Sequence, residues 1–401
     1  MDIRTIISGA ALIIATASVA LAQGPAVPTG GSPTLRLENI RLPQGFHIEL
    51  YATGVVGARM MALSPDGTLF VGSRRVGVGN VYALPDRNHD MKADEVIVLA
   101  KDLYMPHGIA FRDGSLYVAD TSKMLRYDHI EGHLQSPPAP VVLYSNLPQL
   151  RLHQWHFIGF GPDGLLYVPV GSPCTDYCDP NVTDYQGPEG GVVKAEPRFA
   201  TILRMKPDGS GQEIFASGIR NTVGFDWHPV TKEMWFTENS RDGMGADLPS
   251  DELNRAPRAG LHFGYPYCHA GDTKEPQAPP TDCQKFEKPM YNLGPHVAAV
   301  GMRFYTGSMF PAEYRNQIII AEHGSIPVQR PGQPKVGYRL TVAKLNDAGT
   351  AVQSYQPLAE GWLTPDGGVM GRPSDVLVMP DGSLLVSDDQ ANLIYRITYS
   401  N

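Results

Sequence analysis

The sequence has no run of basic residues, and its 41 Asp and Glu side chains outnumber its 33 Lys and Arg. The formal net charge is therefore −8, which argues against a nucleic-acid partner because such partners require a positively charged surface. Beyond the first residues, the chain also has no apolar stretch long enough to cross a bilayer as a helix. We expect no membrane span in the mature chain.

Cysteine is scarce as well, with four in 401 residues. They form two local pairs, Cys174 with Cys178 and Cys268 with Cys283. The second pair is too widely spaced for a four-cysteine zinc site, and the absence of a Cys-x-x-Cys-His motif excludes covalently bound haem of the c type. In an oxidising compartment, these spacings predict two local disulfides.

The first 22 residues predict a secretory signal peptide. Arg4 provides the positive start, residues 6–21 are apolar and rich in small side chains, and residues 20–22 have the Ala-x-Ala form of a cleavage site. An uncleaved anchor is the alternative, but its apolar run is short and a polar, Pro- and Gly-rich stretch follows it. We expect cleavage after Ala22, a flexible segment over residues 23–36 and a periplasmic protein.

Glycine and proline are abundant, with 42 Gly and 35 Pro spread along the chain, which favours short strands joined by turns. One unit recurs: an apolar residue, then Pro-Asp-Gly or a variant, then a strand rich in Leu, Tyr and Val. Its six copies begin at Leu63, Phe111, Phe160, Trp227, Phe310 and Met379. In four of the copies an Asp-Gly step supplies the positive φ of a tight hairpin turn, whereas the copy at Trp227 is degenerate and the one at Phe310 is looser still.

A further strand follows most copies, so each unit has about the four strands of one propeller blade. We therefore predict an all-β fold, a six-bladed β-propeller over residues 37–401. The spacing between copies grows in the middle of the chain, which predicts long inserted loops in blades three to five, on one face. A pair of β-sandwiches is the alternative, and it would not explain six copies of one hairpin.

Residues 216–268 combine a candidate anion-binding turn with an acidic loop. The turn Gly218-Ile-Arg-Asn presents Arg220 and Asn221, and the loop over residues 238–252 is dense in Asp, Glu and Gly. Arg pairs with carboxylates in a bidentate manner, and carboxylate and carbonyl oxygens are the ligands that Ca²⁺ prefers. The alternative is a solvated acidic surface loop.

Histidines also stand at predicted strand-to-loop positions: His107, His153, His296 and His323. His153 could act as a general base because the pKa of imidazole lies near neutrality, although His156 is nearby. Together with Arg220 and Arg372, these groups would form a cationic funnel for an anion. The alternative is a set of unrelated surface residues.

Four motifs, in this order, resemble those of the soluble sugar dehydrogenases that use pyrroloquinoline quinone (PQQ), and in particular their L-sorbosone dehydrogenase-like branch. The resemblance runs from about Leu37 to the C-terminus. The first motif is His153-Gln154, eight residues before Gly161, and the second is Gly218-Ile-Arg-Asn221. The third consists of three segments, Thr237-Glu-Asn239, Asp251-Glu-Leu-Asn254 and Gly264-Tyr-Pro266. The fourth is Gly371-Arg-Pro-Ser-Asp375.

This resemblance implies a six-bladed propeller that holds PQQ and Ca²⁺ on its loop face. It implies His153 as the catalytic base and Arg220 as the charge that stabilises the reduced quinone oxygen. The cofactor contacts that it implies are His153, Gln154, Arg220, Asn221, Asn239, His323 and Arg372. The calcium ligands that it implies are the carbonyls of Ser240 and Arg241 at one site, and the Glu252 carboxylate and Phe263 carbonyl at a second.

Three positions depart from the family pattern: His323 stands for a Lys, Ser374 for an Arg and Ser172 for an Asp. The implied function is a periplasmic quinoprotein that oxidises an aldose or aldehyde sugar, of the glucose or sorbosone type, by hydride transfer to PQQ. An external acceptor, a quinone or cytochrome c, would then take the electrons.

Two other functions remain open. A calcium-dependent lactonase or esterase would need a metal cage of Asp, Glu and Asn on the axis, whereas the axis candidates here are cationic and rich in imidazole. A non-catalytic binding propeller is the second alternative, and the joint presence of His153, Arg220 and Asn221 argues against it.

Overall fold

The computed structural model describes residues 36–74, 79–187 and 190–400. The predicted signal peptide, residues 1–22, and residues 23–35 of the segment after it lie outside the described residues. In the described part, the helical segments are short 3-10 turns: η1 (Leu37–Asn39), η2 (Ile130–His133), η4 (Cys283–Lys285) and η5 (Ala312–Tyr314). None of these described residues forms a helix of the length and apolarity that a membrane span requires.

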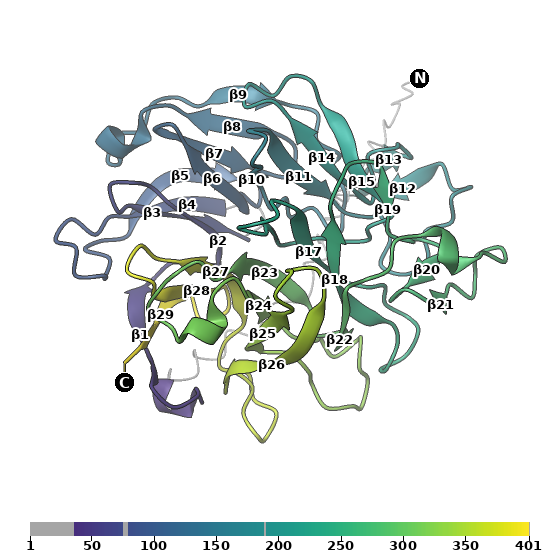
Figure 1. Cartoon of the computed structure of the whole chain (residues 1–401). Helices are drawn as coiled ribbons and strands as arrows, with labels where there is room; N and C mark the ends of the chain where they lie inside the picture. The colour runs from purple at the N-terminus through teal and green to yellow at the C-terminus, as the bar shows by residue number, and fades with distance from the viewer. Residues whose placement is uncertain (1–35, 75–78, 188–189, 401) are drawn as a thin grey trace, which may run out of the picture. The chain divides into compact units, whose positions relative to one another are not determined.

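The remaining regular structure consists of strands, and the large sheets form the six blades of a β-propeller (Figure 1). Blade 1 contains β2 (Ala58–Leu63), β3 (Leu69–Ser73), β4 (Gly79–Leu84) and β5 (Ile97–Leu103). Blade 2 contains β6 (Gly108–Arg112), β7 (Ser115–Ala119), β8 (Met124–Tyr127) and β9 (Val141–Tyr144). Blade 3 contains β10 (Gly159–Phe160), β11 (Leu166–Val170), β14 (Thr201–Met205), β15 (Glu213–Ser217) and the short parallel strand β19 (Leu261–His262).

The last three blades follow the same order. Blade 4 contains β16 (Phe225–Trp227), β17 (Met234–Glu238), β18 (Ser250–Ala256) and β22 (Tyr291–Pro295). Blade 5 contains β23 (Ala299–Phe304), β24 (Ile318–Glu322), β25 (Arg339–Leu345) and β26 (Val352–Glu360). Blade 6 contains β27 (Pro373–Val378), β28 (Leu384–Asp388), β29 (Leu393–Tyr399) and β1 (Phe46–Thr53). The predicted six-bladed propeller is confirmed.

Each repeated sequence unit is the hairpin between the first two strands of a blade. In the first copy, Ser64 and Thr68 close the turn between β2 and β3, and Gly67 has a φ of 90°. A side chain is strained at that φ, which explains the Asp-Gly step.

The first strand of the chain completes the last blade. β1 pairs with β29 in antiparallel register, from Phe46 opposite Tyr399 to Thr53 opposite Leu393. Blade 6 is thereby built from both ends of the propeller sequence, and its first strand β27 contacts β2 of blade 1. This pairing closes the ring.

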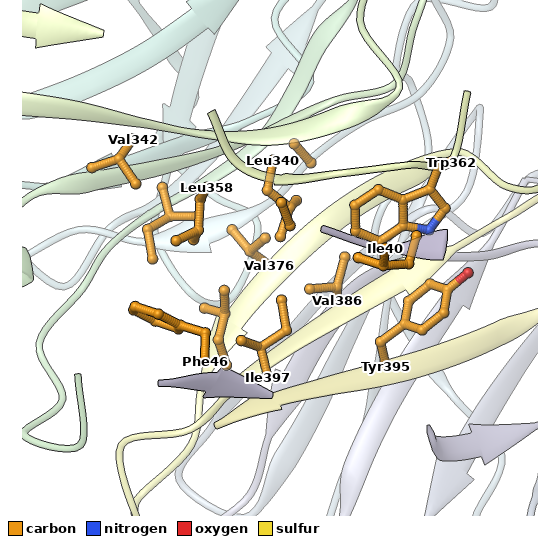
Figure 2. Packing of buried hydrophobic residues seen from close by; sticks show 14 of the residues in the cluster. Ile40, Phe46, Leu340, Val342, Leu358, Trp362, Val376, Val386, Tyr395 and Ile397 are labelled. Carbon is orange, nitrogen blue, oxygen red and sulfur yellow. The ribbon is translucent and has the colours of Figure 1, made fainter. Parts of the chain in front are cut away.

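Apolar side chains fill the space between neighbouring blades. Figure 2 shows one such cluster, in which side chains of β25 and β26 face those of β27, β28 and β29, with further contributions from residues before blade 1. Its members include Ile40, Phe46, Leu340, Val342, Leu358, Trp362, Val376, Val386, Tyr395 and Ile397. Truncation of one such buried aliphatic side chain to Ala costs about 2–5 kcal/mol.

Long insertions interrupt blades 3, 4 and 5, as predicted. The insertion in blade 3 carries the hairpin β12 (Asp184–Gln186) and β13 (Val192–Lys194), and the one in blade 4 carries β20 (Cys268–His269) and β21 (Thr273–Lys274). In blade 5 the insertion joins β24 to β25. The Cys174–Cys178 and Cys268–Cys283 disulfides are both present, which confirms the predicted pairing.

Candidate active site in the axial cavity

Two sets of residues meet at one end of the propeller axis. The first set lies before or at the start of the first strand of a blade: Arg220 and Arg372 precede that strand, and Arg59 is its second residue. The second set follows the second strand, as Asn239 and His323 do. Because the first two strands of a blade are antiparallel, the start of one and the end of the other lie at the same end of the sheet. The topology therefore gathers side chains that are far apart in sequence.

These residues line a cavity of about 310 Å³, a size typical of small-molecule sites. Its lining includes residues from the ends of blades 1, 3, 4, 5 and 6. The predicted site residues among them are His153, Arg220, Asn221, Asn239, Ser240, His323 and Arg372, together with the predicted funnel residue His296. Gln154, Arg241, Glu252 and Phe263 do not line it.

His153 is held as a neutral base at the wall of this cavity. Its Nδ1 lies 2.8 Å from the Ser172 carbonyl oxygen, and because a carbonyl only accepts, Nδ1 carries the proton and Nε2 keeps a lone pair. No other described residue hydrogen-bonds to this ring. Burial and the charge of Arg220 lower the pKa of His153 to about 3, so the imidazole is neutral at neutral pH.

The backbone around His153 fixes the position of the ring. His153 has a φ of 53°, which is unusual for a residue with a side chain. Gly171 packs directly against it, since a Cβ at position 171 would lie 2.4 Å from the Cβ of His153. The Gly after β11 therefore provides the space that the histidine occupies.

Arg220 is buried in the cavity wall and held by several acceptors. Its Nε and Nη2 donate to the Thr175 carbonyl at 3.1 and 2.6 Å, and its Nη1 donates to the Asn239 carbonyl at 3.0 Å. Its Nη2 also lies 3.3 Å from the Asp242 carboxylate. These contacts fix the orientation of a positive charge beside the cavity, with Asn221 next to it.

His156 is structurally distinct from His153. Its Nδ1 lies 2.8 Å from the Pro169 carbonyl and its Nε2 lies 3.2 Å from the Thr121 carbonyl. The ring is buried, lies outside the cavity and connects blade 3 to blade 2. The two neighbouring histidines thus occupy different environments.

Gln154 and Arg241 point to partners outside the cavity. The Gln154 amide donates to the Arg151 carbonyl at 3.0 Å, and its buried Oε1 has no hydrogen-bond partner among the described residues. The Arg241 guanidinium is buried in an ion pair with Glu275. The structure therefore does not bring the Gln154 side chain to the predicted cofactor position, whereas the prediction for Arg241 concerns its carbonyl oxygen and not its guanidinium.

The predicted calcium ligands offer oxygen atoms of the right kind. The carbonyl oxygens of Ser240, Arg241 and Phe263 accept no hydrogen bond from another described residue. Within the described residues, no group of three or more His, Cys, Asp or Glu side chains is arranged to hold a metal. Carbonyl ligands would therefore have to supply much of any calcium site here.

Glu252 lies beside a second buried carboxylate, which suits a cation. Glu238 and Glu252 are directly opposite in the β17–β18 pair. Burial raises the pKa of Glu252 to about 7, and burial together with the adjacent Glu252 raises that of Glu238. Close by, the buried Oδ1 of Asn254 has no hydrogen-bond partner in the described structure. Asp247 is exposed, so this acidic loop is partly a surface loop.

Sequence reasoning missed three charged residues at the axis, namely Arg59, Arg74 and Asp389. Arg59 and Arg74 line the cavity, and both donate to the Asp389 carboxylate, at 2.9 and 3.0 Å. The repeat contains a signal that could have identified Arg59. Arg59 stands seven residues before Asp66 of its hairpin, and Ser374, which stands for an Arg of the family pattern, lies at the same offset before Asp381.

A second cavity, of about 430 Å³, lies beside the Cys174–Cys178 loop. Pro and aromatic side chains form much of its lining, which includes Pro173, Pro197, Phe199 and Tyr265. None of the described residues that line it is an Arg or a Lys. The axial cavity, where cations and a neutral base converge, is therefore the candidate active site.

Comparison with known proteins places the chain in a family. The family model described as glucose/sorbosone dehydrogenase matches residues 128–335, more than half of the chain. An uncharacterized protein of Borreliella burgdorferi is 30% identical over 376 residues, which cover 90% of this chain and 91% of that protein.

Two solved structures share the fold. The holo form of the pyranose dehydrogenase PQQ domain from Coprinopsis cinerea has a TM-score of 0.73 at 20% identity, over 92% of this chain and 99% of that one. The calcium structure of the Trichoderma reesei carbohydrate-active enzyme of family AA12 has a TM-score of 0.73 at 20% identity, over 90% of this chain and 97% of that one. The family match, together with this shared propeller, shows that the chain belongs to the glucose/sorbosone dehydrogenase family.

Proposed function

We propose that this protein oxidises an aldose or an aldehyde sugar, of the glucose or sorbosone type, with PQQ bound in the axial cavity. The observation that carries the proposal is the neutral His153, whose free Nε2 borders a cavity lined by four arginines. Such a lining suits an anionic cofactor because guanidinium groups pair with carboxylates. PQQ has three carboxylates and, when bound, supplies an ortho-quinone that accepts a hydride.

In this proposal, the residues of the chain move one proton and stabilise one charge. His153 Nε2 accepts the proton of the hydroxyl on the reacting carbon, which in an aldehyde sugar is a hydroxyl of its hydrate. A hydride leaves the same carbon for the quinone, and this carbon becomes a carbonyl. The Ser172 carbonyl keeps the ring in the required tautomer. Arg220 holds a fixed positive charge where negative charge develops, and this charge needs no reorganisation during the reaction.

Calcium binding is part of the same proposal. The carbonyls of Ser240 and Arg241 would hold a Ca²⁺ beside the cofactor, because Ser240 lines the cavity and both oxygens are free of other described partners. Glu252 and the Phe263 carbonyl would hold a second Ca²⁺, which would offset the repulsion between the buried Glu238 and Glu252 carboxylates.

We also propose that the protein acts in the periplasm. The predicted signal peptide and the two disulfides support an oxidising compartment. An external quinone or cytochrome c would then accept the electrons. The lactonase alternative requires an axial cage of metal-binding side chains. Asn221, Asn239, Asp242 and Asp251 line the cavity, but no three His, Cys, Asp or Glu side chains of the described residues are grouped to hold a metal.

The test is dye reduction by the purified apoprotein, with and without PQQ and Ca²⁺, across a panel of aldoses and aldehydes. His153→Ala should lower turnover by about 10²–10⁴-fold while PQQ still binds. Arg220→Ala should weaken both turnover and PQQ binding. The exposed His47 provides the matched control, because truncation of the buried His156 would also disturb the contact between two blades.

Two results would contradict the proposal. The first is wild-type protein that binds no PQQ and shows no PQQ-dependent oxidation of any member of the panel. The second is a His153→Ala variant that is folded, as judged by circular dichroism, and turns over at the wild-type rate.

A further inference from the structure

The second cavity, of about 430 Å³, shares a wall with the axial cavity. The loop after β11 contributes Ser172 to the second cavity and Thr175 to the axial one. In the same way, the turn after β15 contributes Gly218 to the second cavity and Arg220 to the axial one. The Ser172 carbonyl also lies 2.8 Å from Nδ1 of His153, which lines the axial cavity. Two short stretches of chain therefore lie between the two cavities.

Aromatic rings and prolines form much of the wall of the second cavity. Tyr185 and Phe199 meet edge to face, with their ring centroids 6.0 Å apart. Tyr265, Pro197 and Pro266 belong to the same lining. Because none of the described lining residues is an Arg or a Lys, an anionic ligand has no counter-charge here. The cavity therefore suits a neutral ligand with a planar ring.

Most polar side chains of this lining already have partners. Ser172 Oγ and the Tyr265 hydroxyl lie 2.7 Å apart, and the Thr201 hydroxyl donates to a backbone carbonyl at 2.7 Å. The Tyr185 hydroxyl donates to another carbonyl at 3.3 Å, and the Glu196 carboxylate accepts from a neighbouring arginine at 2.7 Å. A sugar needs hydrogen-bond partners for several hydroxyls, so this lining suits it poorly.

His262, by contrast, keeps a free donor at the cavity wall. Gly264 N donates to its Nδ1 at 3.1 Å, so the proton of the neutral ring is on Nε2. Burial lowers the pKa of His262, which keeps the ring neutral at neutral pH. Its Nε2–H has no hydrogen-bond partner among the described residues.

The position of the His262 ring is fixed on two sides. It stacks on Phe286, with the ring centroids 4.7 Å apart. On the other side lies Gly218, where a Cβ would lie 2.3 Å from the imidazole. One N–H group is thus held in place at the wall of an otherwise apolar cavity.

We propose that the second cavity binds a neutral para-quinone, which acts as the electron acceptor of the enzyme. Its ring would lie among Tyr185, Phe199 and Tyr265, and one of its carbonyls would accept from His262 Nε2–H. The inference rests on the proposed function, because the electrons that this quinone takes up come from the axial cavity. A cavity of this volume admits a small molecule, so it selects a quinone rather than a cytochrome c.

The balance of the step closes with this acceptor alone. Oxidation of one sugar carbon yields a hydride, which carries two electrons, and a proton that His153 receives. The electrons then cross the shared wall to the acceptor, and the protons left in the axial cavity go to solvent. The acceptor takes two protons from solvent, and its two carbonyls become the hydroxyls of a hydroquinone.

The first arm of the test measures binding of duroquinone, a neutral tetramethyl para-quinone, to PQQ-free protein by isothermal titration calorimetry. Ala195 is exposed and lines the cavity, so Ala195→Trp should fill the space, abolish binding and preserve the fold. His262→Phe keeps a ring beside Phe286 but has no N–H. It should weaken binding by about three- to tenfold, the range for one lost hydrogen bond.

The matched control is Ala312→Trp. Ala312 is also exposed, but it lies in η5 of blade 5 and does not line the cavity. Its affinity for duroquinone should equal that of the wild type.

The second arm compares sugar oxidation by PQQ-loaded protein with duroquinone and with ferricyanide, an anion that this cavity does not suit. In Ala195→Trp the ratio of the duroquinone rate to the ferricyanide rate should fall by about tenfold or more, because the acceptor no longer binds. In Ala312→Trp this ratio should equal that of the wild type.

Four results would overturn the inference. PQQ-free wild type could bind no duroquinone, or Ala195→Trp could bind it as tightly as the wild type. Ala195→Trp could lose binding and keep the wild-type rate ratio, which would place the acceptor elsewhere. Glucose could bind in a way that Ala195→Trp abolishes, which would assign the cavity to a sugar. If the wild type binds no PQQ, the proposed function fails, and the first arm alone decides whether the cavity is a quinone site.

Discussion

Replacement of Asp389 by Asn should destabilise the protein substantially. The Asp389 side chain is fully buried and its partner Arg59 is 4% exposed. Loss of one member of a buried ion pair typically costs about 3–5 kcal/mol, because the other charge stays buried without its partner. The contact with the more exposed Arg74 adds little, since solvent screens it. The ion pair with Arg59 therefore determines how much stability the substitution of Asp389 removes.

The expected change in melting temperature follows from the size of the protein. A chain of this length has an unfolding entropy of about 0.8 kcal/mol per kelvin. Asp389→Asn should therefore lower the melting temperature of the apoprotein by about 4–6 °C in a calorimetric or fluorescence scan. Asp113→Asn is the matched control, because that carboxylate is 86% exposed, and its melting temperature should equal that of the wild type.

The pH dependence of the melting temperature identifies why Asp389→Asn loses stability. Burial acts to raise the pKa of Asp389, but the neighbouring His323, Arg59 and Arg74 outweigh it and hold that pKa well below its usual range. A lowered carboxyl pKa stabilises the fold above the unfolded value of about 3.9, and this stabilisation is lost as the pH falls below it.

The difference between wild type and Asp389→Asn should therefore be constant from pH 8 to about 5 and should decrease below about pH 4. An unchanged melting temperature at pH 7 would refute the reasoning. A deficit that stays constant down to pH 3 in a still-folded protein would show that lost packing, rather than lost charge, causes it.

Two further predictions concern the site. Gly171→Ala should displace His153, since the new Cβ would lie 2.4 Å from the Cβ of His153. We expect kcat to fall by about tenfold or more while PQQ affinity is retained. An unchanged kcat would contradict this role of Gly171. Removal of Ca²⁺ by a chelator should lower the melting temperature of calcium-loaded protein, because a ligand of the native state stabilises it. Glu252→Gln should weaken that response, and elemental analysis that finds no calcium would count against the site.

The repeat made the fold predictable. Six copies of one hairpin signal were enough to give the blade number, although only four of them contain the Asp-Gly turn that specifies a hairpin between two strands locally. The closing strand β1 was not predicted as a strand, since residues 46–53 have no copy of the hairpin signal. Its partner β29 lies at the other end of the chain, and a long-range pairing of this kind leaves no local pattern.

The site was predictable where a motif and a strand end coincide. His153, Arg220 and Asn221 precede the first strands of their blades and line the cavity. Gln154 follows His153 directly in sequence, yet its amide turns away to the Arg151 carbonyl. The direction of a side chain next to a φ of 53° cannot be read from strand alternation, because the backbone there is not extended.

The charged group at the axis could not be predicted from local sequence, because ring closure creates it. Arg59 belongs to blade 1 and Asp389 to blade 6, and they become neighbours only when β1 pairs with β29. Hydrogen bonds cross the same seam: Ser387 Oγ donates to the Arg59 carbonyl at 2.7 Å, and Met61 N donates to Asp375 at 2.9 Å. The contacts that hold Arg59 at the cavity thus also join the first blade to the last. Closure of the propeller and assembly of the cationic side of the cavity are therefore coupled, since loss of either removes the partners of the other.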